Sequence, residues 1–190
     1  MTKATRRDTR KQGALMTATV RIPVGEEHLA KIGGLENVSR RVDGDHVIIS
    51  GERHNAYVNT GLNNSLDLEF GLGGTAVDRM GVTDDATAVT ATTTKLDPTD
   101  DDTVIIKAFD SAATRTNQIV SAIATFTKSD GNIAYSKVGL LNTATDAGTG
   151  LVNVIGGGGS SPYDESFTID LTGTTDFSVT IQLDITAAAT

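Results

Sequence analysis

Three histidines are the first residues to consider for catalysis. His46 and His54 flank an expected strand and its turn, and Asp45 and Ser50 are close to them in the sequence. A serine whose proton is taken by a histidine, itself oriented by an aspartate, is the arrangement of many hydrolases. The chain has no G-x-S-x-G turn to present such a serine. We therefore interpret His28, His46 and His54 as surface or sheet residues, and we expect neither enzymatic activity nor a small-molecule substrate.

Acidic residues gather in one short stretch around Pro98. Several carboxylates at close spacing can hold Ca²⁺, which prefers hard oxygen ligands. The stretch lacks the spacing of an EF-hand loop, and the chain has no H-E-x-x-H motif and no cysteine for a zinc site. A solvated acidic turn is the preferred interpretation, with calcium as the weaker alternative, and no cofactor is expected. The calcium candidates are Asp97, Asp100, Asp101 and Asp102.

A run of four glycines at 156–159 suggests a phosphate-binding loop at first sight. That motif requires a lysine and then a serine or threonine after its last glycine, at the start of a helix. Here Ser160, Ser161 and Pro162 follow instead. The run is therefore predicted to be a flexible loop.

Basic residues are concentrated at the N-terminus. Residues 1–11 carry five cations and one anion, +5 − 1 = +4, so the rest of the chain carries −8 − 4 = −12. A basic arm can dock on an acidic surface of another subunit or bind nucleic acid. Because no aromatic residue is interleaved with the charges to stack on bases, we prefer subunit docking over simple solubility and over nucleic acid. The docking residues are Lys3, Arg6, Arg7, Arg10 and Lys11.

The overall composition limits the remaining classes of protein. Apolar residues make up 38% and aromatic residues 4%, without tryptophan, so subunit contacts are expected to add to the stability of a modest core. No apolar run approaches the roughly 18 residues that span a bilayer. The charged residues 1–16 do not resemble a secretory signal. No membrane partner is expected.

Alternation of apolar and polar residues predicts strands along most of the chain. In 176–186 every second residue is apolar, which places one face in a core and the other in water. Turn residues at 129–132 and 172–175 predict two hairpins, joining 117–128 to 133–141 and 165–171 to 176–186. Residues 42–45 are a predicted turn and 83–102 a predicted loop. The other predicted strands are 19–23, 46–50, 77–82, 103–109 and 151–155.

One helix is predicted over 55–70, where apolar residues recur at steps of three and four. Asn55 before it and Gly71 after it are suitable caps. The alternation near its end also allows a strand. Its apolar face consists of Tyr57, Val58, Leu62, Leu66 and Phe70.

Short strands at regular intervals, separated by turn residues, predict a mainly β fold. We expect an antiparallel β-sandwich of jelly-roll or Ig-like type, with one short helix and an extended N-terminal arm. The chain then divides into a basic flexible arm over 1–16, an extended or irregular segment over 17–45 and a β-sandwich domain over 46–190.

Several short segments occur in a familiar order between residues 57 and 185. They are YVNTGLNNSLDLEFG (57–71), MGVTDDATAV (80–89), TKL (94–96), VSAIATFTKSDGNIA (120–134), VGLLN (138–142), GTGLV (148–152) and SPY (161–163), followed by the final alternating strand. This order resembles a group of small structural proteins of tailed bacteriophages. The chain departs from that group at Lys137, near a position where an acidic residue is common, and in its unusually Asp-rich loops. The resemblance implies a virion component without enzymatic activity.

We therefore expect a non-enzymatic structural subunit of a tailed-phage virion, located at the neck or tail. It would bind copies of itself and other virion proteins through its β-domain and N-terminal arm. A capsid decoration (cement) protein on the outside of the head is the alternative. A host- or carbohydrate-binding module ranks last, because sugar faces favour exposed aromatic rings and the chain has three tyrosines and no tryptophan.

Overall fold

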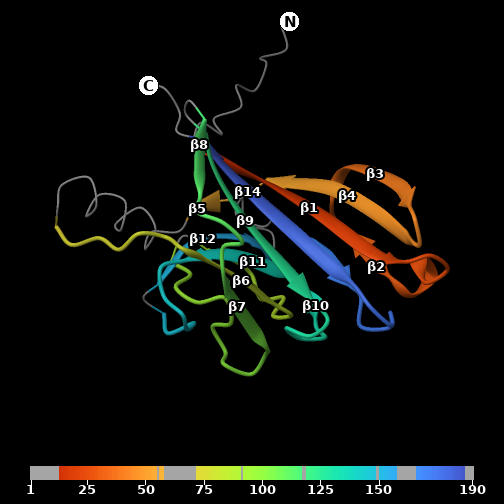
Figure 1. The fold of residues 1–190 in the computed structure, drawn as a ribbon. Coiled ribbons are helices and arrows are strands. Elements are labelled where there is room, and N and C mark those ends of the chain that lie inside the picture. Colours follow the sequence, from red (N-terminus) through yellow and green to blue (C-terminus); the bar gives the residue numbers. More distant parts are fainter. Residues whose placement is uncertain are drawn as a thin grey trace, which may run out of the picture.

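The computed structural model describes residues 13–54, 56–57, 72–90, 92–116, 119–148, 150–157 and 166–186. Within these ranges the chain forms fourteen strands and one short 3-10 helix, η1 (Glu27–Leu29). Every strand pair is antiparallel. The predicted mainly β, antiparallel fold is therefore confirmed (Figure 1). No helix among the described residues is long and apolar enough to cross a membrane.

A six-stranded sheet forms one layer of the fold. Its order across the sheet is β3-β4-β1-β14-β9-β8. The bounds are β3 (Glu36–Asp43), β4 (His46–His54), β1 (Gly13–Pro23), β14 (Ser178–Thr186), β9 (Ile119–Thr127) and β8 (Thr114–Thr116). The sheet is therefore built from both ends of the described chain, with β1 and β14 as its central pair.

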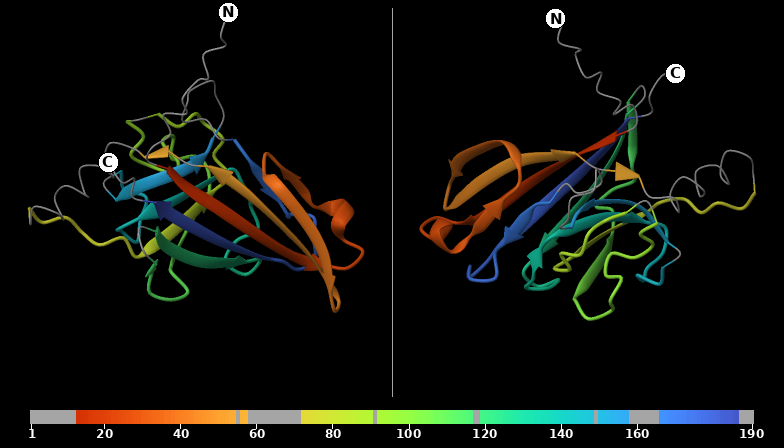
Figure 2. Two further views of the ribbon diagram at one scale, coloured as in Figure 1. Left: turned by 90° about the horizontal axis from the view of Figure 1, so that it is seen from above. Right: turned by 180° about the vertical axis from the view of Figure 1, so that it is seen from behind.

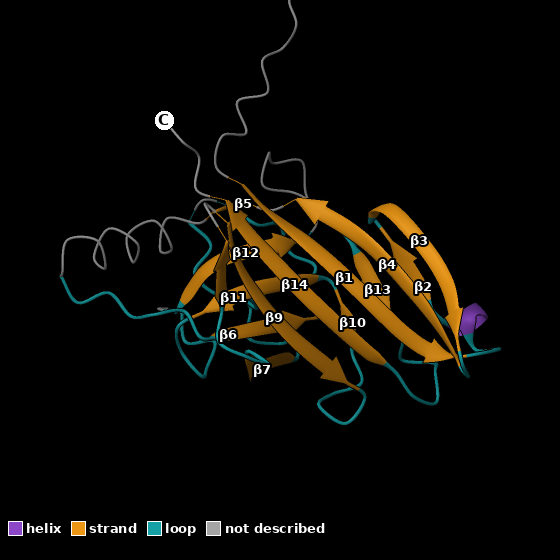
Figure 3. Ribbon diagram, turned by 45° about the horizontal axis from the view of Figure 1, so that its top comes forward, coloured by secondary structure: helices purple, strands orange, loops and turns teal. Residues whose placement is uncertain are grey.

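A five-stranded and a three-stranded sheet lie against the six-stranded sheet. The strands of the five-stranded sheet run across those of the six-stranded sheet (Figure 1, Figure 3). The five-stranded sheet has the order β5-β12-β11-β6-β7 and the three-stranded sheet β10-β13-β2. The first comprises β5 (Ala56–Tyr57), β12 (Leu151–Gly156), β11 (Lys137–Leu141), β6 (Arg79–Thr83) and β7 (Val104–Ala108). The second comprises β10 (Ala134–Tyr135), β13 (Thr168–Asp170) and β2 (Lys31–Gly33).

The main core lies between these layers. Alternate residues of β1 and β14, such as Val20 and its cross-strand partner Val179, are fully buried. They belong to the same cluster as Val82 on β6 and Val138 on β11. The period-two pattern of the sequence thus marks the faces that the two layers turn toward each other.

A second, smaller core lies where the loop over residues 84–103 packs on the five-stranded sheet. Leu96 of this loop is fully buried with Leu141 and Leu151. It lies against Gly81 and Gly139, which are cross-strand partners. A Cβ on Gly81 would lie 2.5 Å from Leu96 Cδ1, and one on Gly139 would lie 2.8 Å from Leu96 Cδ2. The two glycines therefore leave the space that the leucine fills, and the predicted loop is a packed part of the fold.

Both predicted hairpins are wrong, although their strands exist. β9 pairs with β14 and β8, whereas β10, which follows the turn at 129–132, pairs with β13. β13 pairs with β10 and β2, and not with β14. Both turns therefore carry the chain from one sheet to another. Alternation shows that one face of each strand is buried, but it does not show which neighbouring strand completes the hydrogen bonds.

The N-terminal boundaries also differ from those expected. β1 begins at Gly13, so the last residues of the predicted 1–16 arm lie in the six-stranded sheet, where Met16 is fully buried. The segment 17–45 supplies most of β1 together with β2 and β3. Of the predicted helix over 55–70, only Ala56 and Tyr57 lie within the described residues, and they form β5.

Candidate functional site

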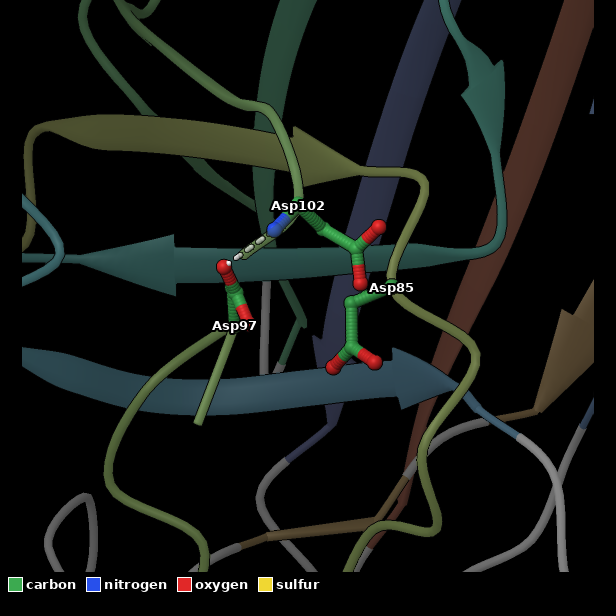
Figure 4. Close-up of side chains that lie close together, drawn as sticks. All are labelled: Asp85, Asp97 and Asp102. Atoms are coloured by element: carbon green, nitrogen blue, oxygen red, sulfur yellow. Dashed lines mark hydrogen bonds between the residues drawn. The ribbon is translucent and has the colours of Figure 1, made fainter. Parts of the chain in front are cut away.

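Three carboxylates meet where the loop 84–103 covers the five-stranded sheet. One oxygen from each of Asp85, Asp97 and Asp102 lies within 4.8 Å of the others. Figure 4 shows the three side chains close together. Asp85 and Asp97 are buried, and Asp102 is exposed. Of the four predicted calcium candidates, the structure brings Asp97 and Asp102 into this group. It adds Asp85, which is not among those four candidates.

The Asp97 carboxylate holds the loop together by accepting hydrogen bonds from backbone amides of the loop. It accepts hydrogen bonds from the amides of Thr99 and Asp100, each at 3.0 Å, and of Asp102 at 2.9 Å. Burial by itself would raise the pKa of Asp97, but these hydrogen bonds lower it below its ordinary value. Asp97 is therefore an ionised acceptor that satisfies the amides of a tight turn.

The Asp85 carboxylate forms an ion pair with Lys137 of β11, and both side chains are buried. The Lys137 ammonium also donates to Thr87 Oγ1 at 2.8 Å and to the Leu96 carbonyl at 3.2 Å. Burial raises the pKa of Asp85, but the contacts with Lys137 and Thr87 outweigh it and lower that pKa overall. The lysine thus supplies the positive charge for this group, and a metal ion at Asp85 would have to compete with it.

The remaining acidic residues differ in their partners. Partial desolvation by neighbouring atoms, and then the negative charges of Asp84 and Asp101, raise the pKa of the exposed Asp102 carboxyl. Asp100 pairs with Lys95 at 2.5 Å, and Asp101 accepts a hydrogen bond from the Thr99 hydroxyl. Asp100 and Asp101 therefore lie outside the three-carboxylate group and face solvent.

A short pattern that the sequence analysis missed recurs in these turns. In three D-x-T segments the threonine donates both its amide and its hydroxyl hydrogen to the aspartate two residues earlier. Asp97 and Thr99 form such a pair at 3.0 and 2.9 Å, and Asp170 and Thr172 form another at 3.1 and 2.7 Å. The same two donors of Thr87 reach Asp85. The many Asp and Thr side chains therefore provide hydrogen-bond partners for backbone groups in turns, where no neighbouring strand does so.

The histidines do not assemble into a triad within the described residues. His46 Nδ1 contacts the Asp45 carboxylate and lies 3.1 Å from Arg21 Nη2. Ser50 is hydrogen-bonded to Thr19 Oγ1 at 3.1 Å, and no described hydrogen bond joins it to His46. His28 Nδ1 lies 3.0 Å from the Gly25 carbonyl oxygen. The side chain of His54 lies outside the described part of the chain.

An exposed sheet edge is a further candidate contact surface. All eight residues of β3 are exposed, and the far edge of β3 pairs with no strand that the structure describes. Val38 and Val42 on β3 are 56% and 59% exposed, and Val24 and Leu29 in the preceding segment are also exposed. We call these four residues together with β3 the β3 edge surface. Figure 2 shows β3 at the rim of the molecule, away from the five-stranded sheet.

Ion pairs and hydrogen bonds fix this edge to its surroundings. Arg40 of β3 pairs with Glu27 of η1 at 2.6 Å, and Asn37 donates to Glu52 of β4 at 2.8 Å. Polar contacts to η1 and β4 therefore hold β3 in place, while Val38 and Val42 stay exposed. The five predicted docking cations of the N-terminal arm, Lys3, Arg6, Arg7, Arg10 and Lys11, all lie outside the described residues.

Comparison with known proteins gave no match to a family model, to a curated protein sequence or to a solved structure. A functional hypothesis therefore depends on the residues and geometry described above.

Proposed function

We propose that the chain is a non-enzymatic structural subunit that assembles with copies of itself and with partner subunits. The observation that carries the proposal is the β3 edge surface, an eight-residue edge strand in which every residue is exposed. Edge strands present unpaired amide and carbonyl groups, so another chain can add a strand to them. Val38 and Val42 are more than half exposed, so they contribute little to the core, and contact with another subunit would bury them.

The particle to which such a subunit would belong is suggested by the resemblance to structural proteins of tailed bacteriophages. We propose a place at the neck or tail of the virion, with a β-sandwich of jelly-roll or Ig-like type. Capsid decoration is the second candidate. The number of copies per particle separates the two, because a decoration protein covers the head in many copies and a neck or tail subunit forms a single ring or stack.

Self-association of the full chain tests the proposal. We expect sedimentation velocity to show a concentration-dependent oligomer, and Val38→Lys with Val42→Lys to shift it toward the monomer, because the lysines place like charges at the contact. Leu72→Lys is the matched control, since Leu72 is 73% exposed and lies outside the β3 edge surface. An unchanged oligomer in the double variant, or a monomer at every concentration, would argue against the proposed contact.

A further inference from the structure

We propose that Lys137 and Asp85 condense into an isopeptide bond, an amide that joins the lysine Nζ to the aspartate Cγ. The two side chains touch, with Lys137 0% exposed and Asp85 1% exposed. They come from positions 52 residues apart in the chain. The proposal stands on the arrangement of atoms around this pair, and it does not depend on how the protein assembles.

Thr87 contacts both reacting groups. Its amide donates to Asp85 Oδ1 at 2.8 Å. Its hydroxyl donates to Asp85 Oδ2 at 2.7 Å and accepts from Lys137 Nζ at 2.8 Å. The amide is therefore placed to stabilise negative charge on Oδ1, as the donors of an oxyanion hole do. The hydroxyl is placed to pass a proton from the nitrogen to Oδ2.

The reaction balances without an outside reagent. One proton moves from the Lys137 ammonium to Asp85 Oδ2, which turns the ion pair into an amine and a carboxylic acid. The amine attacks Cγ, the C–O bond to Oδ2 breaks, and a second proton passes through the Thr87 hydroxyl to Oδ2, which leaves as water. The third proton stays on the new amide nitrogen. No atom is oxidised or reduced.

The surroundings favour the product. The new N–H retains the Leu96 carbonyl, 3.2 Å from Nζ, as its acceptor, and the new carbonyl oxygen retains the Thr87 amide as its donor. Both polar atoms of the amide thus have partners already in place. Condensation also replaces two buried charges, which are costly to hold away from water, with one neutral group. Burial keeps water from the bond once it has formed.

The bond would tie the base of the loop 84–103 to the five-stranded sheet. Asp85 follows β6 by two residues, and Lys137 is the β11 residue paired with Thr83 at the end of β6. A cross-link here would prevent β6 and the loop from separating from β11. A subunit that is pulled on by its neighbours would gain resistance to local opening.

Intact mass spectrometry of the full chain tests the proposal directly. We expect the purified and aged protein to be lighter than its sequence mass by one water molecule, and a peptide digest to join the segment with Asp85 to that with Lys137. Lys137→Arg keeps the charge but lacks the amine and is expected to have the full sequence mass. The Asp-Gly pairs at 43–44 and 130–131 can also lose water by forming a succinimide, but mild alkali reverses that loss and leaves an amide intact.

Variants of Thr87 test the proton relay. Thr87→Val should slow the loss of water or abolish it, and Thr87→Ser should retain it, in a time course on freshly refolded protein. A wild-type mass equal to the sequence mass after prolonged incubation overturns the proposal, whether or not any variant folds. A water loss that persists in Lys137→Arg overturns it as well.

Discussion

Replacing Leu96 with alanine tests whether the loop 84–103 is part of the folded core. The side chain is fully buried, and the sheet beneath it presents glycines at 81 and 139, which cannot extend to fill a gap. A buried leucine truncated to alanine costs about 2–5 kcal/mol, more where the surroundings cannot collapse. We expect about 3 kcal/mol of lost unfolding free energy. For a chain of this size that lowers the melting temperature by roughly 6–12 °C.

The assay is thermal and urea unfolding followed by circular dichroism. Leu72→Ala is the matched control, because the same truncation at a side chain that is 73% exposed should change stability by less than about 0.5 kcal/mol. A loss at Leu96 no larger than that at Leu72 would refute the packed loop.

A double variant sharpens the test. A Cβ on Gly81 would lie 2.5 Å from Leu96 Cδ1, with Leu141 Cδ1 next at 3.0 Å, so Gly81→Ala alone should cost about 1–3 kcal/mol by overpacking. With Leu96→Ala present the nearest clashing atom is gone, and the added methyl fills part of the cavity. We expect the double variant to be more stable than the sum of the two losses predicts, by about 1 kcal/mol. Strict additivity would show that the two residues do not share this space.

Four further predictions concern charge. Deleting residues 2–11 should lower incorporation into particles while the melting temperature stays unchanged; equal incorporation would contradict the arm's docking role. Compared with freshly refolded protein that has not lost water, Lys137→Met should cost about 3–5 kcal/mol in urea unfolding by leaving Asp85 buried without its cation, whereas a neutral result would mean that the pair is not buried together. Because the folded-state pKa of Asp97 lies below its ordinary value of 3.8, its contribution to stability is full above about pH 4–5 and is lost as pH falls through the folded pKa. Asp97→Asn should therefore destabilise the protein more at pH 7 than at pH 2, and an equal loss at both would exclude this ionisation as the cause. The raised pKa of Asp102 has the opposite sign, so Asp102→Asn should stabilise the protein at pH 7 and lose that advantage on acidification.

Local alternation in the sequence was enough to predict most of the strands. The predicted strands at 103–109, 117–128 and 151–155 correspond closely to β7, β9 and β12. β9 buries alternate residues and β12 buries all of its residues, whereas β7 is only partly buried against the two cores, and the apolar side chains of all three strands record that burial. β3 was predicted only as part of an irregular segment. Its residues are exposed on both faces, so no alternation marks it, and its pairing with β4 depends on the Asp43-Gly44 turn. The exposure that makes this strand a candidate contact surface is thus also the reason why the sequence pattern does not reveal it.

Strand pairing was the part that local sequence could not provide. Chain neighbours such as β9 and β10, separated by one turn, lie in different sheets, while β1 pairs with β14 at the opposite end of the chain. Choosing among such partners depends on which faces fill the shared core, and that is a property of the whole fold.

The sequence did contain a signal for the packed loop. Leu96 is a single large apolar residue in a polar run, and Gly81 and Gly139 interrupt two apolar strands where a side chain would be expected to pack.

Lys137 and the Asp-rich loops are connected in space. The structure places one of the loop aspartates, Asp85, on that lysine. A cation buried in a β-sheet needs a buried anion. The loop that supplies this anion is held by the packing of Leu96 in the smaller core and by the hydrogen bond from the Asp102 amide to Asp97. The lysine and its acidic loop are therefore one feature. A change at either member should be tolerated only with a change at the other.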